Sequence, residues 1–283
     1  QSTFAIDVDT GSYTQVRSTL RRGDYVPAEM VRPEELINYF DYGYPGPSEE
    51  ALVAHVDAAP SPFASDHTIV RVGIQATRAK RPAEVGAHLV YLVDVSGSMM
   101  DADKLGLAKA SLRMLTDSLR PTDTVSLVTY AGSVRLVLPP TTVARRADIL
   151  AAIDDLSAEG STAMGDGLKL AYEQAERSFV RGHINRVIVL SDGDANVGAT
   201  SHEEILKSIE AQRKKGITLS TVGFGQSVYN DEMMEQLADA GDGNYQYIDS
   251  PTEAKRAFTA QLDTMIGVVA RDVKIQVDFD PLR

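Results

Sequence analysis

The stretch HLVYLVDVSGSM at residues 88–99 decides the fold of this chain. Its apolar run predicts a strand buried on both faces, and the run ends at Asp94 in a turn of Gly and Ser. After the turn, apolar residues recur at steps of three and four, which is typical of one face of an amphipathic helix: Leu105, Ala108, Leu112, Leu115 and Leu119. A buried strand followed by a helix is the repeating unit of an α/β domain.

Strand and helix patterns continue to alternate toward the C-terminus. The strand patterns at 124–132 and 133–140 are too close together for a helical crossover, so we expect a hairpin with one antiparallel edge strand. Further apolar strands fall at 185–194, 217–225 and 244–249, and helical patterns at about 144–156, 163–181, 202–216, 231–240 and from 252 onward. The predicted fold is therefore α/β, with a doubly wound, mostly parallel six-stranded sheet, one antiparallel edge strand, and helices on both faces.

The first 85 residues have a different character and predict a smaller N-terminal α+β segment. Its patterns are a strand (4–9), two helices (12–22 and 32–40), a turn-rich connector (42–49) and two half-buried strands (51–58 and 67–77). One more strand, at 271–279, needs a partner, and we expect either the N-terminal strands or a further domain to supply it. The predicted division is an N-terminal segment at 1–85, an α/β domain at 86–267, and a terminal strand at 268–283 that starts a truncated C-terminal domain.

Charge and composition exclude several classes of function. The chain has 40 acidic and 28 basic residues, a net charge of −12, and no stripe of Lys and Arg, so nucleic acid is not an expected partner, whereas cations are attracted. The absence of cysteine excludes disulfides and thiolate metal sites. No apolar run approaches the roughly 20 residues that cross a bilayer. Because the chain begins at Gln1 rather than Met, we expect that a segment upstream of Gln1 was removed or was never included, and a signal peptide is one candidate for it.

Five residues in three distant stretches are candidate metal ligands. A D-x-S-x-S turn follows the first buried strand, a Gly-Ser-Thr loop precedes a helix, and an Asp-Gly pair ends the strand at 185–194; the candidates are Asp94, Ser96, Ser98, Thr162 and Asp192. In a doubly wound sheet, ligands bind beyond the carboxyl ends of the strands, where the strand order reverses. If the hairpin lies on one side of the first strand and the later strands on the other, Asp94 and Asp192 face one crevice.

The chemistry of these side chains favours a hard cation. Two carboxylates and three hydroxyls, with no imidazole or thiolate, suit Mg²⁺, with Mn²⁺ and Ca²⁺ as alternatives. So few direct carboxylates leave the ion under-neutralised, with a position open to a carboxylate from another molecule. Turn and capping roles explain a lone D-x-S-x-S equally well, and the matching Thr162 and Asp192 make metal binding the better interpretation.

The three motifs carry a family resemblance. DVSGS at 94–98, GST at 160–162 and SDGD at 191–194 resemble the three-part metal-ion-dependent adhesion site (MIDAS) of von Willebrand factor type A domains, over roughly residues 86–267. The resemblance implies that Ser96 and Ser98 bind the ion directly. It also implies that the two aspartates often act through water and that Thr162 enters and leaves the coordination shell as partners bind.

The implied function is cation-dependent protein binding, as in cell adhesion or scaffolding, and not catalysis. The partner would complete the coordination of the ion with an acidic group. Residues 2–13 and 32–42 further resemble the extra segment of a bacterial subgroup of envelope proteins, and 271–279 resembles the start of the C-terminal domain of those proteins. This narrower resemblance implies an extracytoplasmic location, in the periplasm, in the cell envelope or secreted.

An enzyme is the competing interpretation. FAIDVDT at 4–10 resembles the D-x-D opening of Mg²⁺-dependent haloacid-dehalogenase-type phosphatases, with Asp7 as nucleophile and Asp9 as acid/base. Thr10 and Gly11 arrive in the wrong order for that motif, and the next parallel strand comes too late. Asp9 is better explained as a helix N-cap or as part of a buried turn network.

Several weaker candidates have simpler explanations. Asp101 and Asp103 could form an auxiliary cation site, but acidic residues at a helix start are favoured by the helix dipole alone. Met99 and Met100 either touch a partner beside the metal or fill the core. The histidines have no ligand spacing, so we interpret them as surface or cap residues: His55, His67, His88, His183 and His202.

Overall fold

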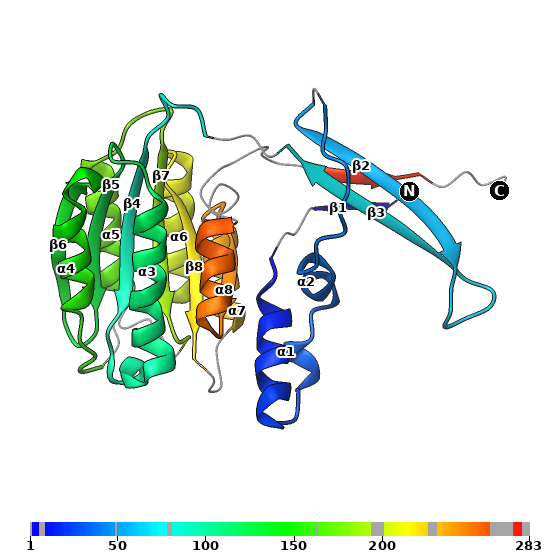
Figure 1. Ribbon diagram of the computed structural model, residues 1–283, viewed down its shortest axis with the longest axis horizontal. Coiled ribbons are helices and arrows are strands. Elements are labelled where there is room, and N and C mark those ends of the chain that lie inside the picture. The colour runs from blue at the N-terminus through cyan, green and yellow to red at the C-terminus, as the bar shows by residue number, and fades with distance from the viewer. Residues whose placement is uncertain are drawn as a thin grey trace.

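The α/β part of the molecule is built on one six-stranded sheet. The computed structural model describes residues 2–5, 9–48, 50–77, 81–161, 164–193, 201–225, 231–260 and 274–278. The sheet has the strand order β6-β5-β4-β7-β8-β9, of which Figure 1 labels the strands from β6 to β8. Its strands are β4 (Ala87–Asp94), β5 (Thr124–Tyr130), β6 (Val134–Thr142), β7 (Ile184–Ser191), β8 (Thr218–Phe224) and β9 (Tyr245–Ile248). Only the β5–β6 pair among them is antiparallel, which confirms the predicted fold class.

Helices cover both faces of this sheet (Figure 1). One face carries α3 (Leu107–Ser118), α4 (Arg146–Asp154), α8 (Pro251–Lys255) and the π-helical turn η5 (Arg256–Ala260), and the other carries α5 (Met164–Arg177), α6 (His202–Lys214) and α7 (Asp231–Ala240). Along β4, Leu89, Tyr91 and Val93 pack into the first layer. Val90 and Leu92 pack into the second. The unbroken apolar run of β4 is therefore explained by burial on both faces.

The strand order reverses at β4. The chain leaves β4 for β5 and the edge strand β6, then returns to pair β7 with the opposite side of β4, in register from Ala87↔Ile184 to Val93↔Leu190. The carboxyl ends of β4 and β7 therefore lie side by side at the reversal point, as predicted. Asp94 ends β4, and Asp192 directly follows β7.

The N-terminal part adds two ribbons and two helices. Its elements are β1 (Ser2–Ala5), α1 (Gly11–Arg22), the short 3₁₀ helix η1 (Ala28–Met30), α2 (Pro33–Asn38), β2 (Leu52–Pro60) and β3 (Thr68–Ala76). The terminal strand β10 (Lys274–Val277) pairs antiparallel with β1, from Ser2↔Val277 to Ala5↔Lys274. Of the two partners expected for this strand, the N-terminal one is observed.

The β2–β3 ribbon differs from the expectation of half-buried strands. The strands pair antiparallel along their full length, but β2 is exposed from Val56 to Pro60 and β3 from Thr68 to Arg71. Val56 is 65% exposed and Ile69 is 44% exposed. Alternation along a strand reports which residues share a face, and it does not require a second layer to cover that face.

Helix α1 covers the β9 edge of the sheet. Gly11 lies so close to Tyr245 that a Cβ atom would come within 2.3 Å of the tyrosine ring. Asp9 Oδ1 accepts the Tyr245 N–H at 3.0 Å, and Gln15 Nε2 donates to Tyr245 Oη at 2.9 Å. The N-cap of α1 is Thr10, so the cap role suggested for Asp9 is wrong and the buried-network role is observed.

A charged cluster strengthens this contact. Arg17 on α1 forms ion pairs with Asp249 at 2.8 Å and with Glu253 at 3.1 Å. It also donates to Tyr39 Oη at 2.7 Å. The N-terminal helices are thereby joined to α8. None of the helices in the described residues has both the length and the apolar character needed to cross a membrane.

Candidate metal centre

The turn after β4 brings two hydroxyls together beside a buried carboxylate. Asp94 is fully buried, and its Oδ1 accepts the Ser96 N–H at 2.9 Å, which closes the turn. The Oγ atoms of Ser96 and Ser98 are 2.9 Å apart. The Val95 N–H donates to Tyr130 O at 3.0 Å and so fixes the turn to the neighbouring strand β5.

The end of β7 is tied to the same carboxylate. Ser191 Oγ donates to Asp94 Oδ2 at 3.1 Å and accepts the Gly193 N–H at 3.1 Å. Asp192, between them in the chain, is 2% exposed. Two carboxylates are therefore buried at the reversal point of the sheet, one from each of two adjacent strand ends.

A third loop packs against the first turn. The Gly97 N–H donates to Gly160 O at 2.9 Å, and the Glu159 N–H donates to Val95 O at 2.7 Å. Gly160 has φ = +78°, and a Cβ atom there would lie 3.2 Å from Gly132 N, so a side chain at this position would be both strained and crowded. Thr162 lies outside the described residues, and its inclusion in the ligand set stays a prediction.

Four of the five candidate ligands thus lie together: Asp94, Ser96, Ser98 and Asp192. Mg²⁺ takes oxygen ligands at about 2.0–2.1 Å in octahedral geometry, which places adjacent ligands about 2.9 Å apart. The two serine hydroxyls have this spacing. Within the described ranges, no three His, Cys, Asp or Glu side chains form a metal-binding group. A divalent ion here would therefore be held by hydroxyls with few carboxylates, and the residues present fit it.

The electrostatics of the site favour a bound cation. Burial raises the pKa of Asp94, and the charge of Asp192 raises it further, while hydrogen bonds from Ser96 and Ser191 oppose the shift. Burial and the charge of Asp94 also raise the pKa of the enclosed Tyr130 hydroxyl well above its usual value. The ionised form of Asp94 is thus held at a cost that a nearby positive charge would offset.

Lys104 is a site residue that the sequence analysis missed. It lies in the π-helical turn η3 (Ala102–Gly106), and its Nζ donates to Asp192 Oδ2 and to Ser98 O, both at 2.9 Å. Its only signal in the sequence is its place between Asp103 and Leu105, at the start of the predicted helix. Ser191 was also missed, although it directly precedes Asp192.

The weaker candidates near the site differ in exposure. Asp101 is exposed and Asp103 is half-buried. Met99 is fully buried in the core, whereas Met100 is 70% exposed. Only the second methionine is therefore available to a partner.

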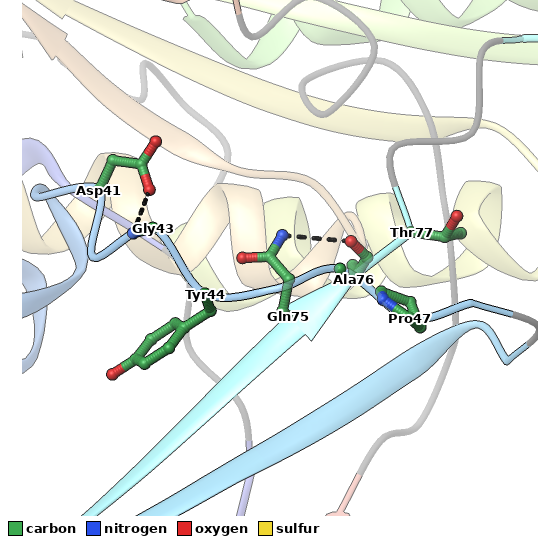
Figure 2. A pocket seen from close by; sticks show the side chains of 8 residues that line it. Asp41, Gly43, Tyr44, Pro47, Gln75, Ala76 and Thr77 are labelled. Carbon is green, nitrogen blue, oxygen red and sulfur yellow. Dashed lines mark hydrogen bonds between the residues drawn. The ribbon is translucent and has the colours of Figure 1, made fainter.

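A separate pocket of about 440 Å³ lies in the N-terminal part and contains none of the predicted ligands (Figure 2). It is lined by Asp41, Gly43, Tyr44, Gly46, Pro47, Gln75, Ala76 and Thr77. Asp41 Oδ1 accepts the Gly43 N–H at 2.8 Å, and Gln75 Nε2 donates to Ala76 O at 3.2 Å (Figure 2). Both of these polar side chains bind backbone groups of the pocket wall.

Comparison with known proteins places these features in one family. The family model for the von Willebrand factor type A domain matches residues 88–261, and a model described as von Willebrand factor matches 1–71. The chain is 42% identical to the protein YfbK of Escherichia coli (strain K12) over 288 residues, which cover 99% of this chain and 50% of YfbK. The chain thus spans about half the length of this relative.

Solved structures share the fold at low sequence identity. A von Willebrand factor type A protein from Catenulispora acidiphila has a TM-score of 0.56 and 20% identity, over 81% of this chain and 52% of that one. Proximal thread matrix protein 1 from the mussel byssus, with a zinc-occupied MIDAS motif, has a TM-score of 0.51 and 22% identity, over 63% of this chain and 48% of that one. Since the matching family model spans more than half of the chain, this protein belongs to the von Willebrand factor type A domain family.

Proposed function

We propose that this chain is a divalent-cation-dependent protein-binding module that does not catalyse a reaction. Its ion is held by Asp94, Ser96, Ser98, Thr162 and Asp192, with Mg²⁺ preferred over Mn²⁺ and Ca²⁺. The observation that carries the proposal is the pair of serine hydroxyls at 2.9 Å beside two buried carboxylates. Proximal thread matrix protein 1, with zinc at its MIDAS, supports the proposal by analogy of fold.

Each protein group has a separate part in this function. Ser96 and Ser98 present the hydroxyl pair, and the Asp94 carboxylate fixes their turn through the Ser96 N–H. Ser191 orients the same carboxylate from β7. When bound, the ion supplies a positive charge that is only partly neutralised by the site. A carboxylate of a partner protein is the group that best completes such a coordination sphere.

The setting of this function is also part of the proposal. We expect adhesion or scaffolding in the bacterial cell envelope, the periplasm or the extracellular space, on the resemblance of 2–13 and 32–42 to envelope proteins. The net charge of −12 argues against a nucleic acid partner. Asp7, the nucleophile of the phosphatase alternative, lies outside the described residues. Asp9 is 6% exposed and binds the backbone of β9, which disfavours its use as an acid/base.

Thermal melting with and without cations tests the metal site. We expect Mg²⁺ to raise the melting temperature of the wild type above its value in chelator, because an ion that binds only the folded state stabilises it by about 2.7 kcal/mol at a hundredfold excess over Kd. Asp94→Ala and Asp192→Ala should each abolish this rise and leave the circular dichroism spectrum native. The proposal is refuted if Mg²⁺, Mn²⁺ and Ca²⁺ all leave the melting temperature of the wild type unchanged and produce no heat of binding in calorimetric titration.

Partner capture with and without chelator tests the second half of the function. A partner recovered from the source organism should bind in Mg²⁺ and dissociate in chelator. Replacing the contacting Asp or Glu of that partner with Asn or Gln should abolish binding. Phosphatase activity that is lost in Asp7→Asn and retained in Asp94→Ala would favour the enzyme instead.

A further inference from the structure

We propose that Lys104 is a built-in counter-cation of the metal site, one that weakens divalent-ion binding and holds the site in shape when no ion is bound. This inference rests on the proposed function and concerns the regulation of the same site. The Lys104 ammonium bridges two of the three site segments, since it donates to Ser98 O and to Asp192 Oδ2 at 2.9 Å each. The bridge links the turn after β4 to the end of β7.

The lysine is committed to this position by its packing. Its side chain is 9% exposed and that of Asp192 is 1% exposed. The aliphatic stem runs under Gly225, where a Cβ atom would come within 2.8 Å of Lys104 Cε and 3.0 Å of its Cγ. A buried ammonium is costly unless it is paired, so Asp192 stabilises the buried lysine and the contact is not a chance surface ion pair.

The charges of the site then differ from those of a site with ligands alone. In formal charge, Asp94 and Asp192 contribute −2, and the Lys104 ammonium brings the sum to −1. A divalent ion changes this sum to +1, whereas it would bring the same site without the lysine to neutrality. The ammonium therefore repels the incoming ion and competes with it for the Asp192 carboxylate. Once the ion is bound, the site keeps a net positive charge, which attracts an acidic partner.

The two carboxylates are therefore not equivalent. Asp192 has a fixed positive charge at 2.9 Å. Asp94 accepts hydrogen bonds from the Ser96 N–H and the Ser191 hydroxyl, which bring no charge. In the absence of metal, the lysine compensates the negative charge of Asp192 on the β7 side of the site. An ion would mainly compensate the negative charge of Asp94 on the β4 side.

Calorimetric titration of the full chain with Mg²⁺ and Mn²⁺ tests the inference, together with melting in chelator. For Lys104→Gln we expect the Kd of both ions to fall about tenfold or more, because a like charge beside the ion is removed. We also expect the melting temperature in chelator to fall. Lys104→Arg retains the charge and should bind ions about as the wild type does. Lys207→Gln is the matched control, since it removes an exposed lysine that pairs with Glu203 on α6.

The outcomes separate this inference from the proposed function. If wild type and Lys104→Gln bind ions with the same Kd, the inference fails and the metal site stands. If only Lys104→Gln binds ions, the inference is supported and a cation-dependent function of the wild type is refuted. If neither binds, both fail. Lys104→Met removes the charge but keeps the apolar stem under Gly225, so it serves as a second variant if Lys104→Gln folds poorly. A Kd for Mg²⁺ in Lys104→Met that equals or exceeds the wild-type Kd overturns the inference.

Discussion

Ser191 donates a hydrogen bond of 3.1 Å to Asp94, and this contact joins the carboxyl ends of the two central strands β4 and β7. Each residue belongs to a different part of the sequence, and each is held by its strand. The Asp94 carboxylate is thus oriented from both sides, by the Ser96 N–H on one oxygen and by the Ser191 hydroxyl on the other.

Ser191→Ala should therefore weaken the site without dismantling the fold. Removing a residue that orients a metal ligand typically lowers metal affinity about 10–100-fold, and a lost buried hydrogen bond costs about 1 kcal/mol. Urea denaturation and Mg²⁺ titration measure the two effects. Ser118→Ala is a matched control, because its hydroxyl donates to Met114 O within α3. Equal Kd values for Ser191→Ala and wild type would contradict the prediction.

In chelator, replacing Asp94 or Asp192 with Asn should change the free energy of unfolding in opposite directions. Burial raises the pKa of Asp94 in the folded chain above its value in the unfolded chain. The contribution of Asp94 to the free energy of unfolding is therefore fully present at a pH below the unfolded-state pKa, and it is lost as the pH rises through the folded-state pKa. At pH 7 Asp94→Asn should then raise the free energy of unfolding. Asp192→Asn should lower it, since the buried ammonium of Lys104 loses its charged partner.

Chemical denaturation at pH 7 in chelator measures both changes. Neither variant should gain stability from Mg²⁺. A loss of stability in Asp94→Asn would contradict the prediction, because it would mean that the charge of Asp94 is stabilised in the absence of metal.

A histidine pair at the amino ends of the central strands predicts a pH dependence. His88 Nε2 lies 3.1 Å from His183 Nδ1 and the rings stack, so these two histidines, interpreted from the sequence as surface or cap residues, form a half-buried pair. Burial, and next the neighbouring His183, lower the pKa of His88 from its usual 6.5. The unfolded chain therefore binds a proton that the folded chain does not, and stability falls as pH drops below 6.5 toward the folded pKa.

Melting temperatures at pH 7.5 and pH 5.5 test this dependence. His88→Gln should reduce the difference between the two temperatures. His67→Gln is a suitable control, because His67 is exposed in the connection between β2 and β3, next to Asp66. A difference that is the same in His88→Gln and wild type would exclude the histidine pair as its source.

Arg17 should be a main determinant of how the N-terminal helices attach. Arg17→Met removes the ion pairs with Asp249 and Glu253 and leaves two buried acids without this partner. Breaking a buried pair in this way costs about 3–5 kcal/mol, and the partial exposure of Arg17 places the expected loss at the low end of that range. Limited proteolysis should cut the N-terminal segment faster. Arg113→Met removes an exposed ion pair with Asp154 and should change neither the free energy of unfolding nor the rate of proteolysis appreciably.

Much of the α/β fold was predictable because its signals are local. The apolar run at 89–93 reports burial on both faces, and the few residues between β5 and β6 allow only a hairpin. The approach of Asp94 and Asp192 was predicted on the condition that the later strands lie on the side of β4 away from the hairpin, and the observed strand order meets that condition. The position of Thr162 and the domain limits remain predictions.

The features that escaped prediction depend on contacts between distant parts of the chain. The burial of Lys104 needs the backbone of Gly225, and the close approach of α1 needs Gly11 to meet Tyr245. The pairing of His88 with His183 needs β4 and β7 to be neighbours. No pattern of apolar and polar residues encodes such a meeting, because each partner has an ordinary local sequence.

The pairing of β1 with β10 has a mechanical consequence. Ser2 faces Val277 and Ala5 faces Lys274, so the outer ends of the two strands lie at the same end of the ribbon. Tension between the flanking chain ends would pull this ribbon open like a zipper, breaking its hydrogen bonds in succession rather than together. The ribbon would then open before the six-stranded sheet is loaded, and the chain would gain length under load while the turn after β4 and the end of β7 keep their positions.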